Sequence, residues 1–140
     1  MTAAPEDSLV KRLADIPLFS ALEPDALERI GALVIPFDAP AGHVLVQYGI
    51  VGSGLFLIDE GAVQVEVHDK KIELGHGEFF GELALLVERA THTARVKAKT
   101  DVTGYCITRD VFTKLLEDEP KIALAMLQVV AHRLADVTTS

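Results

Sequence analysis

Apolar residues recur at helical spacing near the start of the chain, over about residues 6–34. Pro17 interrupts this run. Ser20 followed by Glu23 fits a capping box, and Pro24 fits the first turn of a second helix. The pattern therefore predicts two short helices, whose apolar faces carry Leu9, Val10, Leu13, Ile16, Leu27, Ile30 and Val34.

The middle of the chain, about residues 35–107, has the pattern of short strands. Glycines recur between short apolar runs, and Val63, Val65 and Val67 alternate with polar residues at the period of a half-buried strand. Many short strands with glycine-rich turns favour a sandwich, barrel or roll. Strong helix formers at 81–86 break this pattern and predict a short helix within the β region.

The last part, about residues 109–137, is predicted to be helical again. Pro120 ends a first helix, whose apolar residues are Phe112, Leu115 and Leu116, and opens a second one. The second helix has an apolar stripe wide enough to pack on the roll with one edge and on a partner with the other. Burial of the whole stripe within its own domain is the alternative. The stripe consists of Ala123, Leu127, Val130, Leu134 and Val137, widened by Ile122, Met126 and Val129.

Composition fits one domain over residues 1–140, with 49% apolar and 24% charged residues. The net charge of −8 argues against direct binding of nucleic acid, because the phosphate backbone would be repelled. Cys106 has no second cysteine to pair with, and the N-terminus lacks the pattern of a signal peptide. We therefore expect a cytoplasmic protein, and its apolar runs are too short to span a membrane.

The segment around Gly81 carries the clearest chemistry. A glycine lets the backbone come close to a ligand, and the first turn of the following helix offers unpaired N–H groups to an anion. Glu82 in that turn can accept hydrogen bonds, which suits a sugar hydroxyl on the ligand. The alternative interpretation is an ordinary capped helix with Glu82 in solvent.

The remaining candidates do not indicate catalysis. No nucleophile, base and orienting group stand in a recognisable arrangement, so we expect no enzyme activity and no catalytic residues. His76, in the sequence Gly75–Glu78, reads as a turn histidine, and no metal-ligand spacing is present. Cys106 reads as a buried small hydrophobe. No metal and no required cofactor are therefore expected.

Several segments, in order, resemble the cyclic nucleotide-binding domain family of catabolite-activator-type (Crp/Fnr-like) regulators, cyclic-nucleotide-dependent kinases and gated channels. The resemblance covers nearly the whole chain. Its pieces are Ile16–Ser20, Ala41–Leu45, Leu57–Val65, the phosphate-binding cassette that begins FFGELALL at Phe79, Pro120 and Ala131–Leu134.

The resemblance implies a mainly β fold, a β-roll (double-stranded β-helix or jelly roll) with flanking helices. It also implies a cyclic nucleotide, cAMP or cGMP, or a related small anion inside the roll, with the last helix moving as a lid. In this scheme the backbone near Gly81 approaches the phosphate, Glu82 holds the ribose 2′-hydroxyl and Thr93 offers a hydroxyl. The implied ligand-binding residues are Phe80, Gly81, Glu82, Leu83, Ala84, Arg89, His92, Thr93, Ala94 and Thr138.

His92 is the main departure from the family, because it stands where the family has its phosphate-binding arginine. Arginine offers a permanent charge and a bidentate fork, whereas histidine offers one donor edge and is mostly neutral at neutral pH. If Ala94 faces the interior, His92 does too, and Arg95 points away. Arg89 is another source of positive charge. A tolerated loop residue is the alternative reading of His92.

We therefore expect a regulatory module that senses a cyclic nucleotide through movement of its C-terminal helices. The alternative is an orphan roll that binds no cyclic nucleotide and acts in protein interaction or dimerisation. His92 and the apolar stripe of the last helix favour that alternative. In both cases a protein partner or a homodimer through the last helix is expected.

Overall fold

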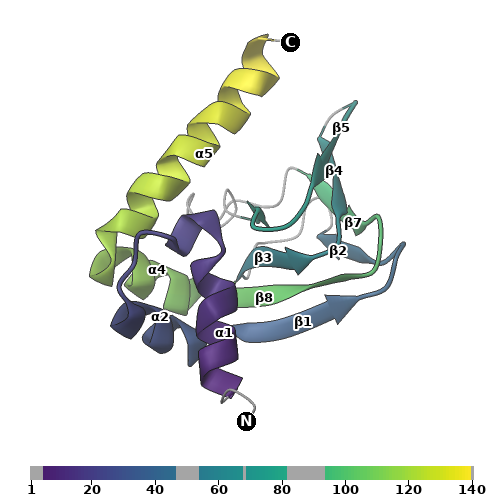
Figure 1. Cartoon of the computed structure of the whole chain (residues 1–140). Helices are drawn as coiled ribbons and strands as arrows, with labels where there is room; N and C mark the ends of the chain where they lie inside the picture. Colours follow the sequence, from purple (N-terminus) through teal and green to yellow (C-terminus); the bar gives the residue numbers. More distant parts are fainter. Residues whose placement is uncertain (1–4, 47–53, 68, 82–93, 140) are drawn as a thin grey trace.

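Two four-stranded antiparallel sheets form a roll, and the helices gather on one side of it (Figure 1). The computed structural model describes residues 5–46, 54–67, 69–81 and 94–139. The helices are α1 (Pro5–Ala14), the 3₁₀ helix η1 (Pro17–Phe19), α2 (Pro24–Gly31), α4 (Arg109–Asp118) and α5 (Pro120–Thr139). Among these residues, no helix combines the length and apolarity needed to cross a bilayer.

The strands pair as the expected β-roll requires. The first sheet has the order β1-β8-β3-β6 and the second the order β2-β7-β4-β5. The strands of the first sheet are β1 (Ile35–Ala39), β8 (Val102–Thr108), β3 (Gly54–Glu60) and β6 (Phe79–Phe80). Those of the second are β2 (Val44–Val46), β7 (Arg95–Ala98), β4 (Val63–Val67) and β5 (Lys70–Leu74).

The first sheet separates two apolar cores. The helix-side core lies between this sheet and the helices, and the roll core lies between the two sheets, in the roll interior. Along β3, Leu55 and Leu57 face the helices, whereas Ile58 and Phe56 face the roll interior. A strand that is covered on both faces reads as a continuous apolar run rather than an alternating one. The run Leu55–Ile58 therefore reflects a central position in the molecule.

The alternation predicted for β4 is confirmed only in part. Val63 is fully buried and Val65 packs against the roll core, as the pattern requires. Gln64, Glu66 and Val67 are half-buried, so the two faces differ less than the sequence suggests. The outer side chains of β4 lie against their neighbours on β5 and β7, which reduces their exposure.

The predicted helix pair at the N-terminus is confirmed, but the predicted capping box is wrong. The residue that caps α2 is Glu23, and its side chain makes no capping bond. Ser20 instead ends η1, and its hydroxyl donates to the carbonyl of Pro17 at 2.9 Å. The Ser20 hydroxyl is thus used in a hydrogen bond within the local 3₁₀ turn and does not cap α2. Pro24 opens α2 as predicted.

In α5 one edge of the predicted stripe packs on the domain and the other edge is exposed, as the first alternative requires. Ile122 and Met126 lie in the helix-side core, and Val129 packs against it. Leu127, on the other edge of the stripe, is 64% exposed, so the stripe is not wholly buried within the domain. Both faces of this helix are apolar, so periodicity alone could not choose between them. The side chains of Leu134 and Val137 lie outside the described residues.

Charged contacts fasten α1 to the roll. Arg12 lies 3.4 Å from the carboxylate of Asp59, which is buried at the end of β3. His76 lies in the turn between β5 and β6, as predicted. Its Nδ1 is 2.5 Å from the carbonyl oxygen of Asp59, and its Nε2 is 3.6 Å from the carboxylate of Asp15, the residue that follows α1.

These contacts make the stability of the fold depend on pH. The hydrogen bond to the Asp59 carbonyl, aided by the charges of Asp15 and Asp59, raises the pKa of His76 above its usual value. A raised folded-state pKa stabilises the protein below the unfolded pKa of about 6.5, and this stabilisation is lost as pH rises through the folded-state pKa. The effect is small, below about 1 kcal/mol, because the ring is half-exposed and screened by solvent.

We expect His76→Gln to reduce the free energy of unfolding more at about pH 6 than at about pH 8. Urea denaturation at both pH values measures this difference. His43→Gln, on an exposed residue before β2, is the matched control. A loss that is equal at the two pH values contradicts the prediction.

Candidate ligand-binding site

The described edge of the candidate site is β6 and the residue that follows it. Phe79 faces the helix-side core and Phe80 faces the roll interior. The ring of Phe80 stacks on Phe56, with centroids 4.9 Å apart, and Phe56 meets Phe37 edge-on at 5.5 Å. Aromatic side chains of β1, β3 and β6 thus line one part of the interior.

Gly81 fixes where the chain leaves β6. Its φ is +92°, a conformation that L side chains rarely adopt. A Cβ atom at this position would lie 2.9 Å from the carbonyl oxygen of Gly54 on β3. From the sequence, we interpret Gly81 as a position where the backbone approaches a ligand. The structure shows that the backbone at Gly81 also lies close to β3.

Most of the predicted ligand-binding residues lie outside the described residues. These are Glu82, Leu83, Ala84, Arg89, His92 and Thr93, and the predicted short helix at 81–86 lies there too, except for Gly81. Their roles stay predictions. Ala94 is half-buried beside β7, and Thr138 lies in the last turn of α5, with its side chain outside the described part.

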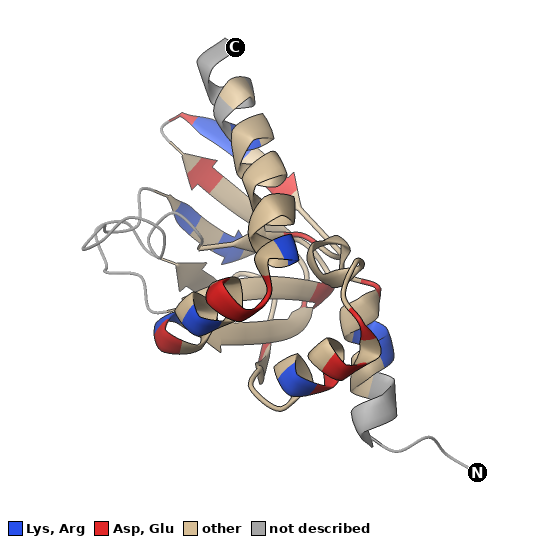
Figure 2. Cartoon of the chain, turned by 90° about the vertical axis from the view of Figure 1, so that its left-hand side faces the viewer, with Lys and Arg blue, Asp and Glu red and all other residues tan. Residues whose placement is uncertain are grey.

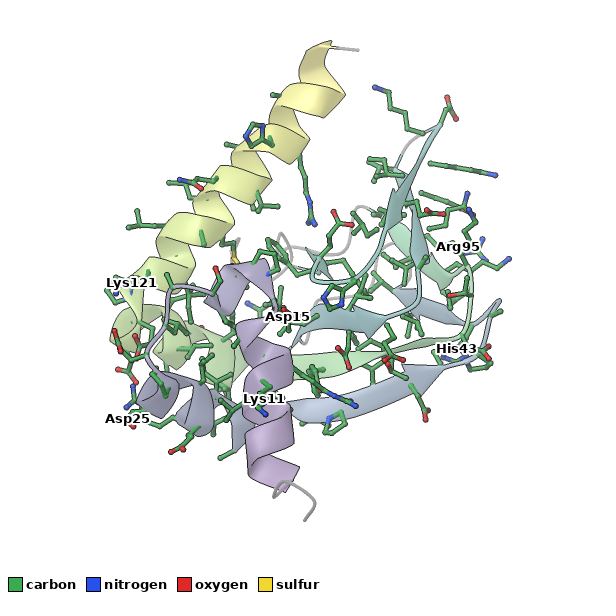
Figure 3. The ribbon with its side chains drawn as sticks, in the orientation of Figure 1. Lys11, Asp15, Asp25, His43, Arg95 and Lys121 are labelled. Atoms are coloured by element: carbon green, nitrogen blue, oxygen red, sulfur yellow. The ribbon has the colours of Figure 1, made fainter. Side chains whose placement is uncertain are left out.

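Arg95 points away from the roll interior, as predicted. Val96 and Ala98 of the same strand are buried in the roll core, so their neighbour Arg95 lies on the opposite face. Its Nη1 is 3.9 Å from the carboxylate of Glu66 on β4, and Figure 3 shows it at the outer side of the second sheet. This arginine is therefore not placed to replace the one that the family uses for phosphate.

Arg133 of α5 is a contact that the sequence reasoning missed. Its Nη2 donates to the carbonyl oxygen of Phe79 at 2.6 Å, and its guanidinium lies 4.6 Å from the centre of the Phe79 ring. Arg133 lies in the segment Ala131–Leu134, but the spacing of residues in this segment gives no indication that Arg133 contacts Phe79, which is distant in the sequence. A helix at the end of the chain thus touches the strand that leads into the candidate site.

A cavity of about 250 Å³ lies elsewhere, between α2 and the start of α5. Glu119 on its wall is paired with Arg29 at 2.6 Å, and Glu23 and Asp25 add further carboxylates. The lining has three carboxylates against Arg29 and Lys121, so it carries no net positive charge that would favour an anion. The lining residues are Leu22, Glu23, Asp25, Ala26, Arg29, Glu119 and Lys121.

Two other kinds of site come into question among the described residues, a metal site and a reactive thiol. They contain no group of three or more His, Cys, Asp or Glu side chains placed to hold a metal ion. Cys106 is half-buried in β8, and this burial raises the pKa of its thiol. A raised pKa disfavours the reactive thiolate, which agrees with the interpretation of Cys106 as a packing residue.

The two-sheet roll and its flanking helices have the architecture of a cyclic nucleotide-binding domain. The sequence pattern of that family matches residues 36–119, and the chain belongs to the family. The expected fold class is thereby confirmed.

Three relatives show the range of proteins that carry similar domains. A cyclic nucleotide-gated potassium channel of Rhizobium etli is 36% identical over 121 residues, which are 86% of this chain and 34% of the channel. The regulatory subunit of a cAMP-independent protein kinase A from Trypanosoma brucei has a TM-score of 0.78 at 25% identity, over 91% of this chain and 47% of that one. The catabolite activator protein of Thermus thermophilus has a TM-score of 0.76 at 26% identity, over 87% and 60%. The chain thus spans about a third of the channel and about half of the regulatory subunit.

A second structure of the Trypanosoma brucei subunit is also similar to this chain. It is a triple mutant, one of whose substitutions replaces threonine with arginine, and it is bound to cAMP in its A site. It has a TM-score of 0.79 at 26% identity, over 89% of this chain and 46% of that one.

The packing of Gly81 predicts a cost for any side chain there. We expect Gly81→Ala to destabilise the protein more than Gly42→Ala. Both glycines have a φ of +92°, but a Cβ atom at Gly42 would meet nothing within 4 Å. The control thus carries only the backbone penalty, about 1–2 kcal/mol. Thermal unfolding measures both variants, and equal losses would show that contact with β3 does not constrain Gly81.

Proposed function

We propose that this chain is a regulatory domain that binds a cyclic nucleotide, cAMP or cGMP, and signals through its C-terminal helices. The observation that carries the proposal is the placement of Phe80 and Gly81. Phe80 faces the interior of a roll that its relatives share, and the segment that resembles the family's phosphate-binding cassette continues along the sequence from Gly81. Ligand would act by binding one position of the helices more tightly than another.

In this proposal the backbone at Gly81, Leu83 and Ala84 approaches the phosphate. Glu82 accepts a hydrogen bond from the ribose 2′-hydroxyl, and Thr93 donates one to the phosphate. Ala94 lies beside the phosphate, and Thr138 at the end of α5 contacts the base. A phosphate held by backbone N–H groups fits the start of a helix, which the sequence predicts there.

His92 takes the place of the phosphate-binding arginine in this scheme, with Arg89 as a second source of positive charge. The orientation of Arg95 toward Glu66 supports this assignment, because it takes Arg95 out of the interior. A bound phosphate favours the charged imidazole, so binding through His92 strengthens as pH falls.

We also propose that the domain acts without a catalytic step and needs no metal. We propose in addition that the module is cytoplasmic. Its negative net charge supports a domain that does not itself bind nucleic acid.

Calorimetric titration with cAMP tests the proposal. We expect tighter binding at about pH 6 than at about pH 8. His92→Arg should tighten binding by about thirtyfold or more, because a buried charge partner is worth about 2–5 kcal/mol. His43→Arg, which adds the same charge at an exposed position, should leave the affinity unchanged.

Absence of binding would contradict the proposal. No heat and no thermal shift with either cAMP or cGMP at millimolar concentration, for the native chain and for His92→Arg alike, would reject the cyclic nucleotide as ligand.

A specific observation favours a second function, association through α5. Leu124 and Leu127 are each 64% exposed, on the side away from the buried residues Ile122 and Met126. The stretch 122–131 carries no charged residue, and the middle turns of α5 are uncoloured in Figure 2. A helix that is apolar on both sides is ordinarily covered on both. This surface fits a second copy of the chain or a partner helix.

We expect Leu127→Glu to shift the chain toward the monomer if α5 forms a dimer. Sedimentation velocity at several concentrations measures the change. Leu33→Glu, at a residue outside α5 that is 48% exposed, is the matched control. Identical sedimentation of the native chain and Leu127→Glu would remove α5 as a homodimer surface.

A further inference from the structure

Arg133 extends the buried face of α5 beyond the apolar core. Ile122, Met126 and Val129 lie on this face, and Arg133 follows them at helical spacing. The helix α5 packs on η1 and α4. Arg133 contacts the roll itself, through β6. The residue is thus placed to determine how α5 lies relative to the first sheet.

The partner of Arg133 is a carbonyl group on the open side of an edge strand. β6 ends the first sheet, and among the described residues it pairs with β3 alone. The carbonyl of Glu78 accepts from the backbone N–H of Ile58 on β3. Successive carbonyls of a strand point to opposite sides, so that of Phe79 points away from β3. The guanidinium of Arg133 satisfies it there.

The same guanidinium also holds the ring of Phe79. Phe79 is 2% exposed, and the 4.6 Å separation from its ring centre is within the range of a cation–π contact. The hydrogen bond is charge-assisted, because its donor is ionised. Two interactions of different kinds therefore fix one side chain in position, and neither the helix nor the strand can shift without changing both.

Phe79 and Phe80 link this contact to the roll interior. They are consecutive, so one faces α5 while the other stacks on Phe56 inside the roll. Gly81 follows directly and is packed against β3. A displacement of Phe79 would therefore also displace Phe80 and Gly81, the first residues of the candidate ligand-binding segment.

We propose that Arg133 is a positioning residue that holds α5 against the open edge of β6 and thereby couples the position of α5 to the start of the ligand-binding segment. The coupling to ligand rests on the proposed function. The holding of α5 does not, and it is tested without ligand.

The first measurement is a distance distribution by pulsed electron paramagnetic resonance, with spin labels at Ala131→Cys on α5 and Thr103→Cys on β8. Both positions are exposed, and Cys106→Ser removes the native thiol. We expect a broader or displaced distribution in Arg133→Ala than in the parent. Lys121→Ala removes a positive charge from the first turn of the same helix and should leave the distribution unchanged. An unchanged distribution in Arg133→Ala overturns the proposal.

Arg133→Gln separates folding from positioning. Glutamine keeps an N–H donor for the carbonyl of Phe79 but loses the charge over its ring. We expect a distribution between those of the parent and Arg133→Ala. If Arg133→Ala does not unfold cooperatively, Arg133→Gln decides the question, and a parental distribution in that variant overturns the proposal.

The second measurement is the affinity for cAMP. We expect Arg133→Ala to weaken binding by about tenfold, because α5 must then be ordered when ligand binds. Lys121→Ala should bind as the parent does. Unchanged affinity in Arg133→Ala, despite a broader distribution, overturns the coupling. If the parent itself binds no cAMP, the proposed function fails, and the distance measurement alone decides whether Arg133 holds α5.

Discussion

The central strands β8 and β3 of the first sheet are covered on both faces, and the rest of the molecule is arranged around them. On β8, Tyr105 and Ile107 face the helices, while Val102 faces the roll. Gly104 lies between them, and a Cβ atom there would collide with the carbonyl of Leu57. The strands can lie this close because the crowded position has no side chain. Removing a large buried side chain from such a sheet costs about 2–5 kcal/mol.

Because the central strands of the first sheet are buried on both faces, they connect the helices on one side with the roll interior, where the candidate site begins, on the other. The helices cover the outer face of the sheet through Leu13, Phe19, Phe112 and Ile122. The inner face closes the roll in which the family holds its ligand. A strand such as β6 has one residue on each side, so it connects a helix contact with an interior contact over the length of one peptide bond.

The sequence could predict those features that depend on local periodicity. Pro24 and Pro120 each open a helix, and the apolar runs around Leu55 and Val63 form strands. The capping box at Ser20 failed because a 3₁₀ turn of three residues was not recognised. Which edge of the α5 stripe packs on the domain could not be predicted, because Leu127 and Met126 are equally apolar and only tertiary packing separates them.

The candidate site was predicted in a different way. Its residues came from resemblance to a family, since a glycine and a glutamate at the start of a short helix have many other uses. The orientation of Arg95 followed from strand alternation and is confirmed. The contact between Arg133 and Phe79 joins residues far apart in the chain, and no local pattern reports such a pair. Periodicity therefore predicted the framework, while the contacts between distant elements required the structure.

The way in which the open strands are covered has a consequence for solubility. An exposed strand edge invites pairing with another molecule, and proteins block it with short strands, proline or charge. Here β6 has only two residues, β1 carries Pro36 and Asp38, and β5 carries Lys70 and Lys71. The guanidinium of Arg133 occupies a carbonyl that a foreign strand would otherwise use. The residue that orients α5 therefore also helps to keep neighbouring molecules from extending the sheet into an aggregate.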